Sequence, residues 1–259
     1  MNLDMTIGYL IDYLTVFLWP FIRVTSFVMV MPVIGGSFVP ARVRILVGLA
    51  LTIVIAPLVT PPDVQPLSLQ GFFLLLREMA VGVMMGFLVQ LVFDAIVLGG
   101  QVIAMSMGLG FAVFLDQARG VNIPVLGQLF LMLGMLVFLS LDGHLAMIQL
   151  IADSFQLLPI GLAGFPAEAQ EAMIHHSRLV FSAAVQIALP AITALLVVNL
   201  SFGVMSRAAP TLNLFAVGFP VAMLLGFVVI FLNMGSLTAI VSLLLQDVLV
   251  AIPDLLRIL

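Results

Sequence analysis

The chain has 259 residues, of which 64% are hydrophobic and 8% charged, and its mean hydropathy is +1.35. This composition is typical of a membrane protein with several spans and excludes an ordinary soluble globular domain. The net charge is −4 and there is no basic run, so nucleic acid is not expected as a partner. Cysteine is absent, which excludes disulfides, thiolate metal sites and a cysteine nucleophile.

Long apolar segments recur along the chain and are separated by prolines, glycines and polar residues. A membrane-spanning helix needs about 20 mostly apolar residues, and several of these segments are longer than that. We therefore predict an all-α fold with six long, kinked helices. Their expected ranges are 8–33, 43–60, 69–99, 126–153, 177–206 and 216–250.

Arginine placement predicts the orientation of these helices. Arg42 and Arg44 flank the connection between the first two predicted helices, and Arg207 opens the connection between the last two. The alternate connections are acidic. Because short cytoplasmic loops are enriched in Lys and Arg, the arginine-bearing connections are expected in the cytoplasm and both termini on the outer side. Arg178 and Arg257 oppose this assignment, so the excess is small.

The stretch 99–124, between the third and fourth predicted helices, is too apolar for an ordinary connecting loop. It is also a poor helix, because each glycine in it costs a helix about 1 kcal/mol relative to alanine. Bulky and small residues alternate over 105–112, which is a period of two rather than 3.6. We therefore predict non-helical backbone at membrane depth, which is tolerated only when buried in protein or lining a cavity. The glycines concerned are Gly99, Gly100, Gly108 and Gly110.

Two interpretations of this stretch are open on physical grounds. Its apolar side chains could close a pore, since an apolar constriction excludes water and methionine adapts to irregular shapes. Alternatively, the stretch could be a buried turn that only fills space between helices. The side chains available for a constriction are Met105, Met107, Leu109, Phe111 and Phe114.

Charged residues inside apolar segments are costly and usually pair or mark a function. Arg77, Glu78 and Asp94 lie within the third predicted helix. Adjacent residues on a helix do not face each other, so Arg77 and Glu78 are expected to find different partners, either interfacial water or another subunit. Asp94 is expected to face a protein neighbour or an aqueous path. Arg23, near one end of the first helix, is expected to reach out to the interface.

Gly82 and Gly86, four residues apart on the third predicted helix, would let another helix approach closely. The sequence shows no phosphate-binding glycine loop, nucleophile elbow or zinc-protease signature. We therefore expect no enzymatic activity, no catalytic residue, no metal site and no cofactor.

Five blocks of sequence occur in an order that resembles one known family. The chain is similar, over nearly its whole length, to the FliR/SctT family of type III secretion export gates, and most closely to its flagellar branch. The block that begins at Ser206 is the most specific. The chain departs from the family pattern at two positions: it has Gln117 where the family usually has Pro, and Thr211 where the family usually has Gln. Both departures affect only the local geometry of a loop. The blocks are Val39-Pro-Ala-Arg-Val-Arg-Ile-Leu-Val-Gly-Leu-Ala-Leu, Glu78 with Gly82 and Gly86-Phe87, Met107-Gly-Leu-Gly-Phe-Ala, Asp142-Gly-His, and Ser206-Arg-Ala-Ala-Pro-Thr-Leu-Asn-Leu-Phe-Ala-Val-Gly-Phe-Pro.

The resemblance implies a non-enzymatic subunit, present in one copy, of the flagellar type III secretion export gate. Such a subunit lies in the lipid of the bacterial inner membrane, at the flagellar basal body, and assembles with FliP and FliQ to form and plug the protein-export channel. An FlhB-like partner is expected on the cytoplasmic side, and the exported substrates are unfolded flagellar proteins. Combined with the arginine placement, both termini are expected on the periplasmic side.

The resemblance also implies roles for particular residues. Residues 1–176 would form a FliP-like helical portion, including a plug loop at 101–124, and residues 177–259 a FliQ-like helical hairpin. The implied channel gasket is the set Met105, Met107, Leu109, Phe111 and Phe114, with hinges at Gly108 and Gly110 and a latch of Asp116 and Arg119. Inter-subunit packing or ion pairs would involve Arg77, Glu78, Gly82, Gly86 and Asp94. The cytoplasmic turn of the hairpin would contain Arg207, Pro210, Asn213 and Phe215.

A proton-coupled secondary transporter of a small solute is the alternative, with Asp94 as the coupling carboxylate. Transporters of that kind commonly show interrupted segments at corresponding positions of two halves, and this sequence shows no such pair.

Overall fold

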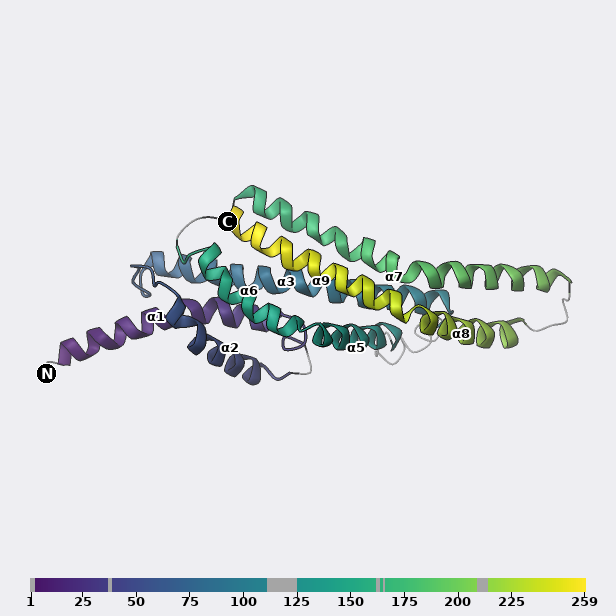
Figure 1. Cartoon of the computed structure of the whole chain (residues 1–259), viewed down its shortest axis with the longest axis horizontal. Coiled ribbons are helices and arrows are strands. Elements are labelled where there is room, and N and C mark those ends of the chain that lie inside the picture. The colour runs from purple at the N-terminus through teal and green to yellow at the C-terminus, as the bar shows by residue number, and fades with distance from the viewer. Residues whose placement is uncertain (1–2, 37–38, 111–124, 162–163, 165, 209–213) are drawn as a thin grey trace. The chain divides into compact units, whose positions relative to one another are not determined.

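The computed structural model describes residues 3–36, 39–110, 125–161, 164, 166–208 and 214–259, and for 3–15 and 214–217 it describes only the backbone. These residues form helices and no strand, as the sequence predicts (Figure 1). The α-helices are α1 (Leu3–Val30), α2 (Ala41–Ile55), α3 (Leu69–Ser106), α5 (Val125–Ser140), α6 (Gly143–Leu157), α7 (Ala167–Ala208), α8 (Leu214–Leu232) and α9 (Met234–Ile258), with a 3-10 helix η1 (Ala56–Leu58) after α2.

Four helical stretches in the described part of the chain are long and apolar enough to cross a membrane: Ala41–Leu58, Leu69–Ser106, Ala167–Ala208 and Met234–Ile258. The pair α5 and α6, bent by 69° at its junction, makes a fifth if it counts as one span. The chain is therefore a membrane protein, with four or five such stretches among the residues that the structure describes.

Two of the predicted helices are broken. The helix expected over 126–153 ends at Ser140 and starts again at Gly143, because Asp142 has a left-handed backbone with φ of 55° that no α-helix can contain. The helix expected over 216–250 is interrupted at Asn233. The Asn233 amide is shared between the carbonyls of Val229 and Ile230, and its side-chain Nδ2 donates to Val229 as well. This side chain competes for a carbonyl of the preceding turn.

The polar stretch expected to connect the fourth and fifth helices is largely helical. Helix α7 begins at Ala167, ten residues before the predicted start at 177. Glu168 lies in its first turn, where a carboxylate interacts favourably with the positive end of the helix dipole. Helix boundaries placed by hydropathy miss such a polar first turn, because hydropathy detects only the apolar part of a helix.

Contacts within the chain divide it into two compact units. Unit 1 comprises residues 1–90, 142–177 and 245–259, and unit 2 comprises residues 91–141 and 178–244.

In unit 1, one face of α1 is buried at a spacing of four residues, at Trp19, Arg23 and Phe27. Helix α3 approaches this face of α1 closely through Gly82 and Gly86. A Cβ on Gly82 would overlap the Arg23 carbonyl, and a Cβ on Gly86 would lie 3.0 Å from the Phe27 carbonyl oxygen. The close helix approach predicted from Gly82 and Gly86 therefore occurs, with α1 of the same chain.

In unit 2, α3 continues through the glycines where the sequence predicts a loop. A Cβ on Gly99 would lie 2.9 Å from Ile187 Cγ2 of α7, and a Cβ on Gly100 would lie 2.9 Å from the Leu126 carbonyl of α5. The two glycines therefore admit neighbouring helices on two sides of α3. The prediction of non-helical backbone from 99, and of a plug loop from 101, is wrong for residues up to Ser106, because packing outweighs the helix propensity of glycine.

Helix α3 ends in a Schellman motif centred on Gly108. The Leu109 amide donates to the Ala104 carbonyl over 3.0 Å, and the Gly108 amide donates to the Met105 carbonyl over 3.1 Å. Gly108 has φ of 83°, which glycine adopts without strain. The alternation predicted over 105–112 would place Met105 and Met107 on the same side of the chain. Met105 is still helical, however, and the two side chains differ: Met105 is 71% exposed and Met107 is 1% exposed.

Replacing Gly100 with alanine tests the packing role of these glycines. The added Cβ would meet backbone atoms of Leu126 and Gly127, which cannot move aside cheaply. We expect Gly100→Ala to lower the free energy of unfolding by about 1–3 kcal/mol, measured on the purified chain in mild detergent.

Gly203→Ala on α7 is the matched control, because a Cβ at Gly203 has nothing within 4 Å. This variant is expected to be neutral or stabilising by up to about 1 kcal/mol. Equal effects of the two substitutions would contradict the packing explanation.

Candidate functional site

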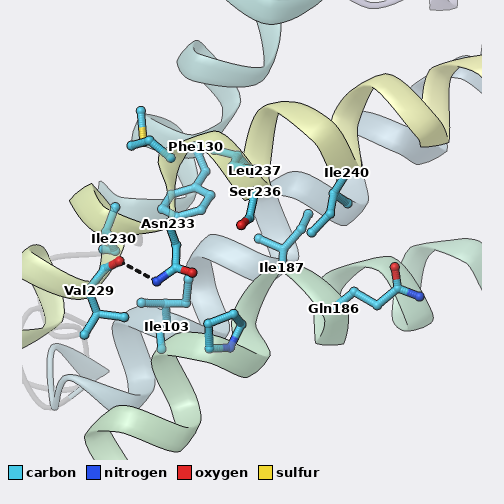
Figure 2. Close-up of a pocket in the computed structure, with 13 residues that line it drawn as sticks. Ile103, Phe130, Gln186, Ile187, Val229, Ile230, Asn233, Ser236, Leu237 and Ile240 are labelled. Carbon is cyan, nitrogen blue, oxygen red and sulfur yellow. Dashed lines mark hydrogen bonds between the residues drawn. The ribbon is translucent and has the colours of Figure 1, made fainter.

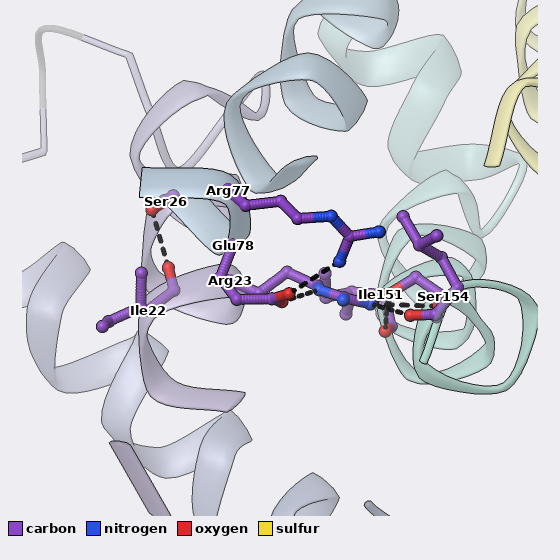
Figure 3. A network of polar contacts seen from close by, with 8 residues as sticks. Ile22, Arg23, Ser26, Arg77, Glu78, Ile151 and Ser154 are labelled. Carbon is purple, nitrogen blue, oxygen red and sulfur yellow. Dashed lines mark hydrogen bonds and ion pairs between the residues drawn. The ribbon is translucent and has the colours of Figure 1, made fainter. Parts of the chain in front are cut away.

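Three charged side chains form a buried cluster in unit 1: Arg23 of α1, and Arg77 and Glu78 of α3 (Figure 3). Arg23 Nε lies 2.6 Å from Glu78 Oε2, and Arg77 Nη1 lies 3.3 Å from Glu78 Oε1. The side chains of Arg23 and Glu78 are fully buried, and that of Arg77 is 7% exposed. One carboxylate therefore binds two guanidinium groups, which its two oxygens allow.

Arg23 also binds the C-terminal end of α6. Its Nη1 donates to the Ser154 carbonyl over 3.0 Å and to the Leu158 carbonyl over 2.9 Å, and its guanidinium lies 4.4 Å from the centre of the Phe155 ring. The last carbonyls of a helix have no partner within the helix and form the negative end of its dipole. Arg23 therefore joins α1, α3 and the end of α6 through one cation.

The cluster contains two cations and one anion. Arg23 Nη2 is buried and has no hydrogen-bond partner among the described residues. Charges inside an apolar protein are costly unless they are paired and hydrogen-bonded. Carbonyl oxygens of α6 compensate Arg23, whereas Arg77 depends on Glu78, the carboxylate that Arg23 also uses.

A second feature lies in unit 2, where α3 ends. The Met107 side chain fills a notch on α8 at Gly226, and the Phe219 ring of α8 lies beside Gly108. A Cβ on Gly226 would lie 2.5–2.7 Å from Met107 Cγ, Sδ and Cε, and a Cβ on Gly108 would lie 3.2 Å from Phe219 Cδ2. The first residues after α3 are therefore held against α8.

Unit 2 also contains a cavity with about 30 Å³ of space beside two helix irregularities, Pro190 in α7 and Asn233 between α8 and α9 (Figure 2). Its lining is mostly aliphatic, including Ile103, Ile187 and Ile240. The cavity has room for about one water molecule, whereas sites for small organic ligands measure about 300–1,000 Å³. This volume is too small for a small organic solute.

Residues 14–248 match the sequence model of the family described as bacterial export proteins, family 1. The flagellar biosynthetic protein FliR of Escherichia coli K12 is 36% identical over 216 residues, which is 83% of each chain. The chain belongs to the FliR family of bacterial export proteins. The FliR of Pectobacterium carotovorum is 35% identical over 248 residues, 95% of each chain, and that of Bacillus subtilis 168 is 28% identical over 236 residues, 90% of this chain and 91% of its own.

The structure corrects two expectations about the charges of this FliR-family chain. Arg77 and Glu78 were expected to have different partners, yet they bind each other, because both side chains bend toward the same buried site next to α1. Arg23 was expected to reach the membrane interface, but it is fully buried against Glu78 and α6. Asp94, on α3, is exposed and is not without an interaction partner.

Sequence reasoning missed the roles of Arg23 and Ser154. The signal for Arg23 was its spacing, because it lies four residues after Trp19 and four before Phe27, so that a cation interrupts an apolar helix face. A buried carboxylate such as Glu78 is the expected partner of a cation in that position. Ser154 gave no comparable signal, since its carbonyl, rather than its hydroxyl, is the closer ligand of Arg23, at 3.0 Å against 3.4 Å.

The remaining predicted site residues are only partly covered by the structure. Leu109 and Gly110 follow α3 and are half-buried, and Arg207 lies in the last turn of α7. Phe215 lies on α8, where only its backbone is described. The predicted gasket, latch and turn residues outside the described parts of the chain are Phe111, Phe114, Asp116, Arg119, Pro210 and Asn213. Within the described residues, no three His, Cys, Asp or Glu side chains converge as a metal site would require.

Neutralising Glu78 tests the cluster. In Glu78→Gln, Arg23 and Arg77 remain buried without an anion, so we expect the free energy of unfolding to fall by about 3–5 kcal/mol. Unfolding of the purified chain in mild detergent measures this loss.

Asp254→Asn is the control, because its 2.8 Å ion pair with Arg257 has both side chains 63% exposed. Removing an exposed pair changes stability by less than about 1 kcal/mol. If Glu78→Gln were as mild as Asp254→Asn, the buried cluster would not stabilise unit 1.

Proposed function

We propose that this chain is a subunit of the flagellar protein-export gate in the bacterial inner membrane. It assembles there with FliP- and FliQ-like subunits, in one copy, around the channel that unfolded flagellar proteins use. The observation that carries the proposal is the alignment over 83–95% of the chain with relatives named flagellar biosynthetic protein FliR. Four helical stretches in its described residues are long and apolar enough to cross the membrane, as such a subunit requires. The subunit contributes structure to the gate and performs no catalytic step.

Residues 105–124 are proposed to plug the channel of the resting gate. Apolar side chains close a pore because water leaves a narrow apolar passage. Met105 supports this role, because 71% of its side chain is exposed at the end of α3 and therefore available to a channel. The pair Asp116 and Arg119 would hold the segment in its closed position.

A contact to a neighbouring subunit is proposed at Arg77, the one member of the buried charge cluster that is slightly exposed. Arg77 has five N–H groups, is slightly exposed and shares its carboxylate with Arg23. A carboxylate from a FliP- or FliQ-like neighbour would balance this surplus positive charge. An FlhB-like partner is proposed at the cytoplasmic turn after Arg207, with both termini of the chain in the periplasm.

Purification in mild detergent followed by mass spectrometry tests the assembly. FliP- and FliQ-like chains are expected to remain bound to this subunit. Arg77→Gln is expected to reduce their recovery while the isolated chain stays folded, because Glu78 still balances Arg23. Recovery of a lone monomer that drives proton-coupled uptake, lost in Asp94→Asn, would instead support a transporter.

Deletion of residues 105–112 tests the plug. In membranes that contain the assembled gate, the deletion is expected to raise the leakage of small ions above that of the wild-type gate, because the apolar constriction is removed. A gate that stays as tight as wild type would refute the plug, provided that FliP- and FliQ-like partners still co-purify.

A further inference from the structure

One face of α8 forms a seat for the residues that follow α3, at Phe219 and Gly226. Phe219, Ala222 and Gly226 are spaced three and four apart, so they share that face. Ala222 is 5% exposed and Gly226 is buried, whereas Phe219 is 38% exposed. The missing side chain of Gly226 leaves a notch on this face, and the Phe219 ring lies beside Gly108.

Met107 fills this notch. Its side chain is 1% exposed, and its Cγ, Sδ and Cε all lie within 2.7 Å of the position that a Cβ on Gly226 would take. Only glycine at position 226 therefore leaves room for Met107 in this place. Methionine suits such a seat, since its unbranched side chain fits irregular gaps.

The backbone of Met107 is fixed as firmly as its side chain. The Met107 amide donates to the Ile103 carbonyl over 2.9 Å, and the two Schellman bonds of Gly108 and Leu109 follow directly. Gly108 has φ of 83° and contacts Phe219, so a side chain at this position would meet both backbone strain and that ring. The chain direction after α3 is therefore set where Met107 meets α8.

The two methionines of the predicted gasket consequently have different surroundings. Met105 is 71% exposed, whereas the volume of Met107 is already occupied by its contact with α8. A side chain committed to a seat within its own subunit cannot also close a channel. Met107 therefore needs a role other than sealing.

We infer that Met107, seated against Gly226, is a positioning residue that anchors the start of the plug segment to α8. Resting on the plug role proposed above, this inference assigns the sealing function to Met105 and to residues after Gly108, and the holding function to Met107. It also couples the plug to the α7–α8 part of the chain, because a displacement of α8 moves the seat of Met107. An unseated Met107 leaves the segment without its fixed end.

Gly226→Ala tests the anchor directly. Its Cβ clashes with the far end of a flexible side chain rather than with backbone, so the variant is expected to fold with Met107 displaced. Oxidation of methionine by dilute peroxide follows exposure, and fragmentation mass spectrometry resolves each residue. In the purified wild-type chain in mild detergent we expect Met107 to oxidise on the order of tenfold more slowly than Met105, because Met105 is exposed there and Met107 is buried. In Gly226→Ala most of this protection is lost.

Gly235→Ala on α9 is the control for an added methyl group, because nothing lies within 4 Å of a Cβ there. It is expected to leave the protection of Met107 unchanged. The double variant Met107→Ala with Gly226→Ala should be no less stable than Met107→Ala alone, because the clash requires the Met107 side chain. Unchanged Met107 oxidation in Gly226→Ala would overturn the inference.

Ion leakage of the assembled gate connects the seat to the plug. We expect both Gly226→Ala and Met107→Ala to raise leakage, and Gly235→Ala to leave it at the wild-type level. If deletion of 105–112 makes the gate leak but an unseated Met107 does not, the anchor inference is wrong and the plug proposal stands. If the deletion leaves the gate tight, the plug proposal fails, while the oxidation pattern still decides whether Met107 is seated.

Discussion

The guanidinium of Arg23 is the interaction on which unit 1 depends. A cation can be fully buried only if anions and carbonyl dipoles replace its water, and for Arg23 the anion and the dipoles come from two different helices. Glu78 on α3 supplies the charge, and the last carbonyls of α6 supply the dipoles. The end of α6 therefore lies where it can satisfy Arg23, whose own carbonyl is the point at which α3 approaches α1 through Gly82.

The glycines of α3 carry the second constraint. Gly82 and Gly86 admit α1 in unit 1, and Gly99 and Gly100 admit α7 and α5 in unit 2. Each glycine lowers helix propensity, yet all four are helical, because close contact between helix backbones outweighs about 1 kcal/mol per residue. A membrane helix has little hydrophobic driving force for association, so this close approach is what packing requires.

Hydropathy was sufficient to predict an all-helical membrane protein, because burial in lipid requires long apolar helices. It was not sufficient to place breaks, since one left-handed residue at Asp142 and one side-chain hydrogen bond at Asn233 interrupt helices without changing their polarity. Nor was the charge cluster predictable, because Arg23 lies 55 residues from Glu78 and 131 from Ser154. Such partners depend on tertiary packing, which a local sequence pattern does not contain.

Gly108 was predicted to be a hinge of the plug, but in the structure it ends α3 with a defined backbone conformation. Its positive φ and its two Schellman bonds end α3 at a defined residue, and a Cβ there would lie only 3.2 Å from Phe219 Cδ2. After Gly108, the bond from the Leu109 amide to the Ala104 carbonyl still ties the chain to α3. Fixing one end of a segment is a precondition for its use as a plug, because a segment loose at both ends would not return to the same closed position. Gly108 and the seated Met107 together provide that fixed end within unit 2.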